Sequence, residues 1–212
     1  MQIASRWKSV FIAGETKPSA KLMATLLLAG SILAPLAHSH SRVADEMATS
    51  IKSVVAQMQA ERMHRLSSYI ARNFKISKAK AVDIVAECQR HADKFDLDPE
   101  LILAVIAVES TFRERAVSSA GARGLMQVLP RAHPKKVRSI GGVHALFDPS
   151  KNIHTGSRIL TEYLERSDGD LNNALLRYNG SLRDPKARYA AKVMRQYGKL
   201  KQVTGNEVAS LN

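Results

Sequence analysis

A largely apolar segment lies in the middle of the chain, Asp98-Pro99-Glu100-Leu101-Ile102-Leu103-Ala104-Val105-Ile106-Ala107-Val108-Glu109-Ser110-Thr111-Phe112. Asp98 can accept hydrogen bonds from the free amides of a first helical turn, and Pro99 suits the first helical position, so a helix is predicted to begin here. It carries no charge from Leu101 to Val108. A helix that is apolar on nearly all its faces is covered by neighbours on several sides, and about ten residues are too few to span a membrane. We therefore expect a helical domain built around this segment.

Glu109 stands in the last turn of this predicted helix. Apolar surroundings and the negative end of the helix dipole both disfavour a charged carboxylate, so the pKa of Glu109 is expected to rise. A carboxylic acid that stays protonated near neutral pH is what general-acid cleavage of a glycosidic bond requires. The alternative is a structural carboxylate that caps the helix or pairs with Arg113 or Arg123. Taken alone, the residue leaves both interpretations open.

The composition indicates a helical globular protein with a basic surface. The chain has 212 residues, of which 45% are hydrophobic and 5% aromatic, enough for one domain with a core and an appendage. The formal charge of +13 favours polyanionic partners such as a carboxylate-rich cell wall, an anionic membrane surface or nucleic acid. Nucleic acid is not the expected partner, because the chain has neither a recognised nucleic-acid motif nor clustered aromatic residues for base stacking.

Cysteine and histidine usage gives no indication of redox or metal chemistry. A single cysteine, Cys88, excludes an internal disulfide, and its apolar helical surroundings predict a buried core residue rather than a nucleophile. The seven histidines are scattered along the chain without metal-ligand spacing. No metal and no cofactor are expected.

Residues 1–41 are predicted to be a signal peptide or a membrane anchor. Basic residues precede an uncharged apolar run at 22–37, and the small residues Ala37 and Ser39 suit positions −3 and −1 of a cleavage site after Ser39. An uncleaved membrane anchor and an internal helix are the alternatives. We expect an exported protein of the periplasm or cell envelope, with membrane association through this segment if it is retained.

Residues 42–96 are predicted to form a helical N-terminal extension of two helices. The first, Val43 to Arg72, has apolar residues three and four apart, which predict a packing face; they are Met47, Ile51, Val54, Val55, Met58, Met63, Leu66, Tyr69 and Ile70. The second, Lys78 to Phe95, is capped by Ser77. Its inward residues are expected to be Ala81, Ile84, Val85 and Cys88.

Three further helices are expected downstream. Residues 130–142 are basic and irregular and are predicted to form a loop. A helix from Pro149 to about Arg166 contains Gly156, which allows the close approach of another backbone. The next helices are predicted over Leu171–Tyr178, where Asn179-Gly180 forms the turn, and from Lys186 to about Val203. Residues 204–212 are predicted to be a flexible tail.

Several short motifs occur together in one order. They are Glu109-Ser110, Ser118, Gly121-Ala122-Arg123-Gly124-Leu125-Met126-Gln127, Asn152 with Gly156, Tyr178-Asn179, and Tyr189 ahead of Val193. This series resembles the catalytic domain of the soluble lytic transglycosylase (SLT) family, which is related to goose-type lysozyme, over roughly Pro99 to Tyr197. The resemblance implies an all-α, lysozyme-like transglycosylase domain at 97–203 with a groove between two lobes.

The resemblance also implies roles for individual residues. Glu109 would be the sole catalytic acid and base. Ser118, Gln127, Tyr178 and Asn179 would contact the glycan or position the acid, and Tyr189 matches a tyrosine of the same cleft.

The implied activity is that of a peptidoglycan lytic transglycosylase. Such an enzyme cleaves the β-1,4 bond between N-acetylmuramic acid (MurNAc) and N-acetylglucosamine (GlcNAc) without water and leaves 1,6-anhydro-MurNAc ends. Hydrolytic glycosidases use two carboxylates, whereas the matched motifs supply Glu109 alone. The alternatives are a hydrolytic muramidase and a non-catalytic basic module that binds wall glycan. The expected partners are peptidoglycan strands and a secretion or conjugation apparatus, and the protein is expected to be a monomer.

Overall fold

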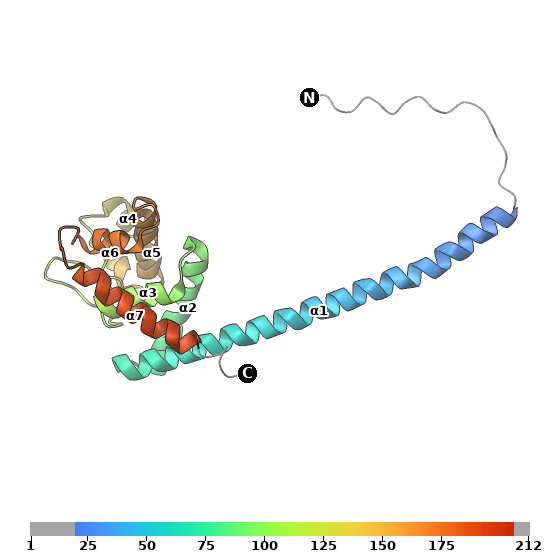
Figure 1. The fold of residues 1–212 in the computed structure, drawn as a ribbon. Helices are drawn as coiled ribbons and strands as arrows, with labels where there is room; N and C mark the ends of the chain where they lie inside the picture. The colour runs from blue at the N-terminus through green and yellow to red at the C-terminus, as the bar shows by residue number, and fades with distance from the viewer. Residues whose placement is uncertain (1–19, 206–212) are drawn as a thin grey trace, which may run out of the picture. The chain divides into compact units, whose positions relative to one another are not determined.

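The computed structural model describes the backbone of residues 20–205 and the side chains of residues 45–205. Every regular element in this range is a helix, and the two isolated β-bridges, Val117 with Arg123 and Arg123 with Val128, belong to no strand (Figure 1). The chain divides into two units, one up to Ala56 and one that begins at Gln57. All the motif residues lie in the second unit, so the predicted all-α fold class is confirmed where the site lies.

The first helix, α1, runs from Ala20 to Phe74 and therefore begins well before the predicted start at Val43. Its apolar stripe is a packing face only in part: Leu66 and Ile70 are buried, whereas Met47, Ile51, Val54, Val55 and Met58 are exposed. The predicted signal peptide or anchor, residues 1–41, lies outside the residues whose side chains are described. Within the described part of the chain, no helix combines the length and the hydropathy that a membrane span requires.

Two capped helices form the centre of the second unit. α2, Lys78–Phe95, begins at the Ser77 cap, and α3, Pro99–Glu109, begins at the Asp98 cap, whose carboxylate accepts the Glu100 amide hydrogen bond at 3.0 Å. Both predictions are confirmed. Every residue of α3 from Pro99 to Ala107 is buried, because α3 packs against both α2 and α7, Arg188–Gly205.

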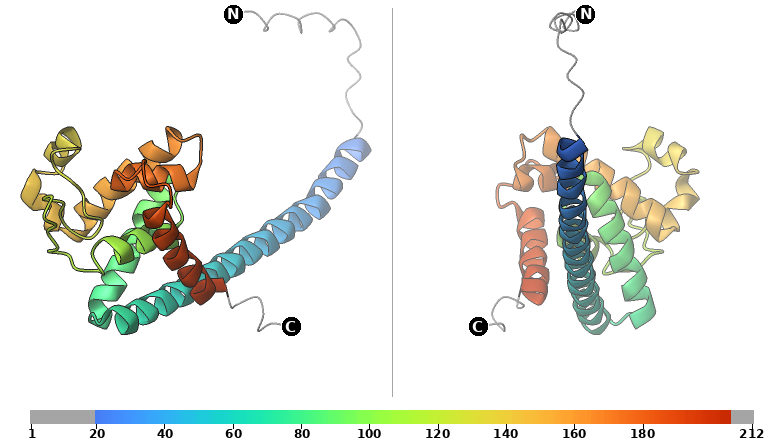
Figure 2. Two further views of the ribbon diagram at one scale, coloured as in Figure 1. Left: turned by 60° about the vertical axis from the view of Figure 1, so that its left-hand side comes forward. Right: turned by 90° about the vertical axis from the view of Figure 1, so that its right-hand side faces the viewer.

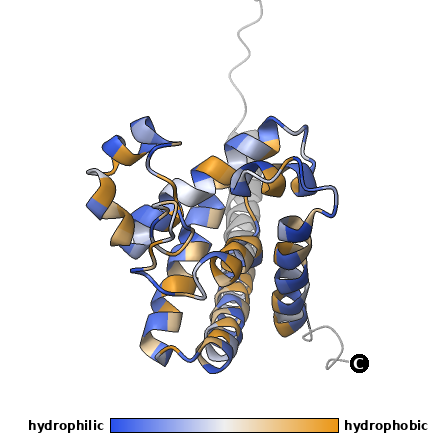
Figure 3. Cartoon of the chain, turned by 90° about the vertical axis from the view of Figure 1, so that its left-hand side faces the viewer, coloured by the Kyte–Doolittle hydropathy of each residue, from blue (hydrophilic) through white to orange (hydrophobic). Residues whose placement is uncertain are grey.

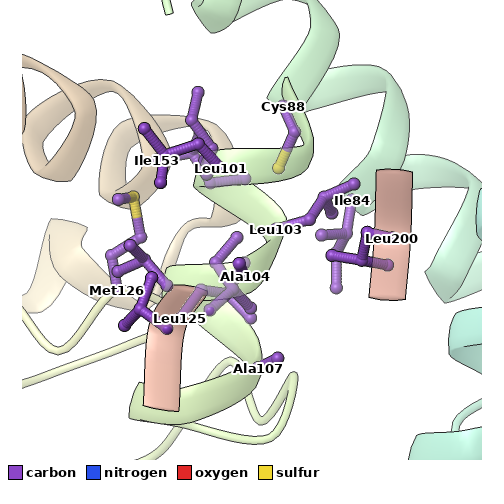
Figure 4. Packing of buried hydrophobic residues seen from close by; sticks show 14 of the residues in the cluster. Ile84, Cys88, Leu101, Leu103, Ala104, Ala107, Leu125, Met126, Ile153 and Leu200 are labelled. Atoms are coloured by element: carbon purple, nitrogen blue, oxygen red, sulfur yellow. The ribbon is translucent and has the colours of Figure 1, made fainter. Parts of the chain in front are cut away.

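Figure 4 shows how the main core surrounds α3. Leu101, Leu103, Ala104 and Ala107 of α3 contact side chains from four other segments; these are Ile84, Cys88, Leu125, Met126, Ile153 and Leu200. Cys88 is fully buried, as predicted, and burial raises the pKa of its thiol well above the usual value. The main core therefore joins the segment that carries Glu109 to α2, to α5 (Pro149–Glu165) and to α7.

A second, smaller core corrects the predicted loop at 130–142. The sequence there forms a short helix, α4, Pro134–Ser139, followed by the 3-10 helix η1, Val143–Phe147. Pro134 suits a first helical position, and Val137 is buried among a few apolar residues, which are Val128, Leu146 and Ile159. Figure 2 shows α4 and η1 (yellow) and α7 (red) on opposite sides of the domain.

The last helices follow the predicted order with small shifts at their ends. α5, Pro149–Glu165, starts at the Asp148 cap, and α6, Leu171–Asn179, stops at Gly180 with a left-handed φ of 73°. α7 begins at Arg188 rather than Lys186, because the Asp184 carboxylate accepts the backbone amides of both residues and holds the preceding turn.

α7 is amphipathic and ends later than predicted. Hydrophilic and hydrophobic residues alternate along it (Figure 3), and Val193 and Leu200 are buried. The predicted tail at 204–212 is wrong for its first two residues, since Thr204 and Gly205 are helical and Thr204 donates a hydrogen bond to Glu100 at 3.0 Å. Residues 206–212 lie outside the described part of the chain.

Candidate active site

Glu109 is the last residue of α3, and one hydrogen bond defines its position. The Tyr189 hydroxyl, from the first turn of α7, donates to Glu109 Oε1 at 2.7 Å. Burial raises the pKa of Glu109 to about 7, and the hydrogen bond from Tyr189 opposes that rise. The predicted upward shift is confirmed. A carboxyl with this pKa is partly protonated at neutral pH and can both give and take a proton there.

The alternative role of Glu109 as the partner of an arginine is not seen. Arg113 turns back to the main chain, where its Nε donates to Ser110 O at 3.0 Å. The Arg123 guanidinium lies over the Phe147 ring, 5.4 Å from its centroid. Glu109 takes part in none of the ion pairs of residues 45–205. Among the side chains that the structure describes, no cation therefore forms an ion pair with Glu109.

Tyr178 and Tyr189 both lie close to Glu109. Burial is the main cause that raises the pKa of each phenol well above its ordinary value, and the charge of Glu109 adds to it. Tyr178 donates to Met126 O at 2.8 Å and packs against both hydrophobic cores. Both hydroxyls consequently stay protonated at neutral pH, one bound to Glu109 and the other to the adjacent loop.

That loop, Gly124 to Gln127, is held by one buried amide. Asn152 of α5 accepts the Met126 amide at 2.8 Å and donates to Arg123 O at 2.9 Å and Leu146 O at 2.8 Å. Gly124 has a φ of 77°, and a Cβ there would lie 2.1 Å from Asn152 Nδ2 and 2.2 Å from Leu146 O. Only glycine fits this position. The motif pairing of the loop with Asn152 is thus explained by hydrogen bonding, although the sequence alone assigned Asn152 no role.

Gly156 corrects one sequence expectation. The close neighbour at Gly156 is the Met126 side chain, whose Sδ would lie 2.5 Å from an added Cβ, and not a second backbone. Met126 is fully buried and shares the main core with Ile153, one helical turn away on α5. The glycine therefore lets α5 pack directly on the loop that faces Tyr178.

The side chains of Gln127 and Ser118 are both hydrogen-bonded to main-chain atoms of the segment between α3 and α4. The Gln127 side chain donates to Ala116 O at 3.1 Å and Gly124 O at 3.0 Å, and its φ is 48°. Ser118 Oγ accepts the Ala122 amide at 3.0 Å. These contacts leave the amide oxygen of Gln127 and the hydroxyl hydrogen of Ser118 for a ligand.

Asn179 is the predicted site residue that the structure connects least. It is exposed at the end of α6, directly after Tyr178, and none of the hydrogen bonds of residues 45–205 involves its side chain. The structure thus brings Glu109, Tyr189 and Tyr178 together, and it connects Tyr178 to the carbonyl of Met126, the residue before Gln127. Ser118 and Asn179 stand at the ends of the neighbouring segments.

A turn after Glu109 was not foreseen from the sequence. Thr111 and Phe112 are consecutive non-glycine residues with left-handed φ values of 52° and 63°. The usual turn residues, glycine and asparagine, are absent from this stretch, so the sequence carried no signal for it.

Comparison with known proteins finds relatives that are named as transglycosylases. The transglycosylase of Enterobacteria phage PRD1 is 38% identical over 107 residues, which cover 50% of this chain and 37% of that protein. Membrane-bound lytic murein transglycosylase C of Actinobacillus pleuropneumoniae serotype 5b (strain L20) is 30% identical over 135 residues, which cover 58% of this chain and 37% of that protein. The chain therefore spans 37% of the length of either relative.

Two solved structures share the fold. The 70 kDa soluble lytic transglycosylase of Escherichia coli aligns with a TM-score of 0.54 at 18% identity, over 66% of this chain and 30% of that one. An inactive mutant of lytic transglycosylase Slt from Pseudomonas aeruginosa aligns with a TM-score of 0.51 at 22% identity, over 55% and 24%. The family model for the transglycosylase SLT domain matches residues 87–199, more than half of the chain. The chain belongs to the transglycosylase SLT domain family.

Proposed function

We propose that the protein is a peptidoglycan lytic transglycosylase in which Glu109 is the single catalytic acid and base. The observation that supports this most directly is the state of that carboxyl: its pKa is raised to about 7 by burial, and no cation pairs with it among the described residues. The names of the PRD1 and Actinobacillus relatives point to the same activity.

The proposed reaction leaves Glu109 protonated, as it began, and moves one proton in net terms from the MurNAc C6 hydroxyl to the leaving oxygen. Glu109 protonates the glycosidic oxygen as the bond from MurNAc C1 to that oxygen breaks, and the N-acetyl group of MurNAc supports the oxocarbenium-like centre. The C6 hydroxyl then attacks C1 and gives its proton to the Glu109 carboxylate, which closes the 1,6-anhydro ring. A pKa near the working pH suits both steps. The Tyr189 hydroxyl stabilises the carboxylate between them, because it donates a hydrogen bond to the charged form.

The remaining predicted site residues are proposed to bind the glycan. Tyr178 lies close to Glu109, and Gln127 follows Met126, whose carbonyl accepts the Tyr178 hydrogen bond. Ser118 and Asn179 offer a hydroxyl and an exposed amide in the adjoining segments. Tyr178 and Gln127 have a second duty, since their own hydrogen bonds hold the loop from Gly124 to Gln127.

We also propose the setting in which the enzyme works. The basic charge of +13, the predicted signal peptide or anchor at 1–41 and the membrane-bound murein relative support a location in the periplasm or cell envelope. Local opening of the wall for a secretion or conjugation apparatus would suit a small, monomeric enzyme of this kind.

Mass spectrometry of the fragments released from purified peptidoglycan tests the activity. The full chain should release anhydro-muropeptides, and the Glu109→Gln variant should release none while it still binds the glycan. Fragments with reducing ends would identify a hydrolytic muramidase instead. Binding without cleavage by either protein would identify a non-catalytic wall-binding module.

A further inference from the structure

The turn that follows Glu109 has a backbone that its residues do not favour. Thr111 (φ 52°) and Phe112 (φ 63°) are both left-handed. Residues other than glycine, asparagine and aspartate rarely adopt this conformation, and a β-branched residue such as threonine does so least readily. Thr111 is exposed, and its hydroxyl donates a hydrogen bond to the adjacent Ser110 O at 2.6 Å. The Arg113 amide closes the turn with a hydrogen bond to Ser110 O at 3.2 Å, and the packing of Phe112, which is completely buried, fixes its position against the core.

Phe112 packs against an aromatic ring from the end of α1. The centroids of Phe74 and Phe112 are 4.6 Å apart, with the ring planes tilted by 58°. Offset and tilted aromatic pairs of this kind are favourable beyond the apolar area that they bury. Phe74 is the last residue of α1, and it also packs against the main core.

A second contact reaches the same segment from the start of α2. The Lys80 ammonium pairs with the Glu114 carboxylate at 3.0 Å. Phe74 and Lys80 both precede residue 87, where the match to the SLT family model begins. The segment after Glu109 is thus held by two residues outside the matched domain, one through an aromatic pair and one through an ion pair.

We propose that Phe74 is a positioning residue for Glu109. Phe112 follows Glu109 in the chain with only Ser110 and Thr111 between them. Ser110 is fixed to α3, because its amide and its hydroxyl both donate hydrogen bonds to Ile106 O. When Phe74 holds Phe112, α3 ends in a fixed left-handed turn and the Glu109 carboxyl faces the Tyr189 hydroxyl. This inference rests on the proposed transglycosylase function for its catalytic meaning. It assigns a role to residues upstream of the family domain.

The test compares Phe74→Ala with Phe95→Ala in the full chain, using a soluble peptidoglycan fragment as substrate. Phe95 is a matched control, because it is also half-buried but contacts the rings of His91 and His154 rather than the turn. Phe74→Ala is expected to lower kcat roughly tenfold or more with KM within about twofold, since small displacements of a catalytic group are costly. Phe95→Ala should leave both constants within about twofold, and Phe74→Tyr, which keeps the ring, should retain most of kcat.

Two further measurements separate positioning from stability. Thr111→Gly removes the backbone penalty at one residue of the turn and should restore part of kcat in the Phe74→Ala background. A carbon-13 NMR titration of the Glu109 carboxyl, assigned with Glu109→Gln, needs no activity. Phe74→Ala should bring its pKa down from about 7 towards the ordinary value, because the loosened turn admits water.

The outcomes that overturn the proposal are distinct from failure of the proposed function. An unchanged kcat in Phe74→Ala, or an equal loss in Phe95→Ala at the same melting temperature, would exclude a positioning role. If the unaltered chain does not cleave the fragment, the transglycosylase proposal fails. The NMR titration of the Glu109 carboxyl then decides the positioning proposal by itself. An unchanged Glu109 pKa in Phe74→Ala would show that the Phe74–Phe112 contact does not position Glu109.

Discussion

Glu109 and Tyr189 form a pair in which two influences on one carboxyl oppose each other. Burial favours the neutral acid, and the hydroxyl donor favours the carboxylate; the result is a pKa of about 7 rather than an extreme value. An acid that is too weak would donate its proton poorly in the first step, and one that is too strong would be ionised before that step and would accept the C6 hydroxyl proton poorly in the second. The tyrosine thus adjusts the acid for a reaction with two proton transfers.

Removing the hydroxyl should raise the pKa of Glu109. Tyr189→Phe keeps the ring but removes the group that stabilises the carboxylate, so the alkaline limb of the kcat profile should move upward by roughly one pH unit. The maximal kcat should fall roughly tenfold, because the carboxylate that accepts the C6 hydroxyl proton loses its stabilising donor. The pH dependence of glycan cleavage from pH 5 to 9 measures both effects. A limb that moves to lower pH would contradict this account.

The raised pKa of Glu109 also predicts a dependence of stability on pH. The folded protein holds a proton at Glu109 that the unfolded chain releases near the ordinary value of 4.5, so the contribution is complete below pH 4.5 and is lost as the pH rises through about 7. Glutamine does not titrate. The free energy of unfolding of Glu109→Gln, relative to that of the unaltered chain, should therefore increase between pH 5 and pH 8 by up to about 3 kcal/mol.

Urea unfolding at the two pH values provides the comparison. Asp184→Asn is a suitable control, because Asp184 is a half-buried carboxylate whose pKa is lowered rather than raised. Its stability difference should not move in the same direction. A constant difference for Glu109→Gln would show that the carboxyl has an ordinary pKa in the folded protein.

Helix ends were predictable from the sequence where their signals are local. The caps at Ser77, Asp98 and Asp148 depend on one side chain and the next two or three amides, so these helix starts were predicted correctly. α4 was missed because a six-residue helix owes its stability to the burial of Val137 in a core formed by distant segments. The start of α7 was displaced by the Asp184 turn.

The candidate site, like the helix ends, was predictable from the sequence where the signal is local and unpredictable where distant contacts decide. The position of Glu109 at a buried helix end, and the direction of its pKa, follow from the apolar run that precedes it. Glu109 and Tyr189 are 80 residues apart in the sequence, so no local pattern predicts that they meet. The family resemblance named both residues as part of one cleft but did not predict the hydrogen bond between them. The left-handed turn at Thr111 and Phe112 had no local signal at all, because distant packing imposes it.

The loop between α3 and α4 should be far less tolerant of substitution at Gly124 than at Gly121. Both have positive φ values, 77° and 85°, so alanine is strained at each. An added Cβ meets nothing within 4 Å at Gly121, whereas at Gly124 it overlaps Asn152 and the Leu146 carbonyl. Gly121→Ala should cost about 1 kcal/mol and Gly124→Ala more than about 3 kcal/mol in the free energy of unfolding. Similar losses in thermal or urea unfolding would contradict the packing described for Gly124.

The assembled second unit depends on a buried acid at the other end of α3. Glu100 is fully buried, and it accepts hydrogen bonds from Arg62 of α1 and Thr204 of α7. Asp98, next to it, accepts from Tyr197 and Lys201, also of α7. Three helices that are distant in the sequence therefore meet around two carboxylates, and the end of α1 belongs to the same packing unit as the family domain.

Removing the Arg62 partner of the buried Glu100 should lower the free energy of unfolding far more than removing one partner of an exposed ion pair. Arg62→Met leaves Glu100 buried without its cation, so the free energy of unfolding should fall by about 3–5 kcal/mol. Arg90→Met removes an exposed partner of Glu87 and should cost less than about 1 kcal/mol. Urea denaturation of both variants at pH 7 provides the measurement. Equal losses would mean that Glu100 reaches water in the absence of Arg62.

The buried thiol of Cys88 offers a built-in reporter for these experiments. Since Cys88 is fully enclosed by α2, α3 and their neighbours and the pKa of its thiol is raised, no reagent can reach it in the folded state. Its rate of modification by a thiol-reactive dye consequently counts how often the domain opens. The same enclosure protects the single cysteine from oxidation and from cross-linking to a second molecule in the oxidising compartment where the protein is proposed to work.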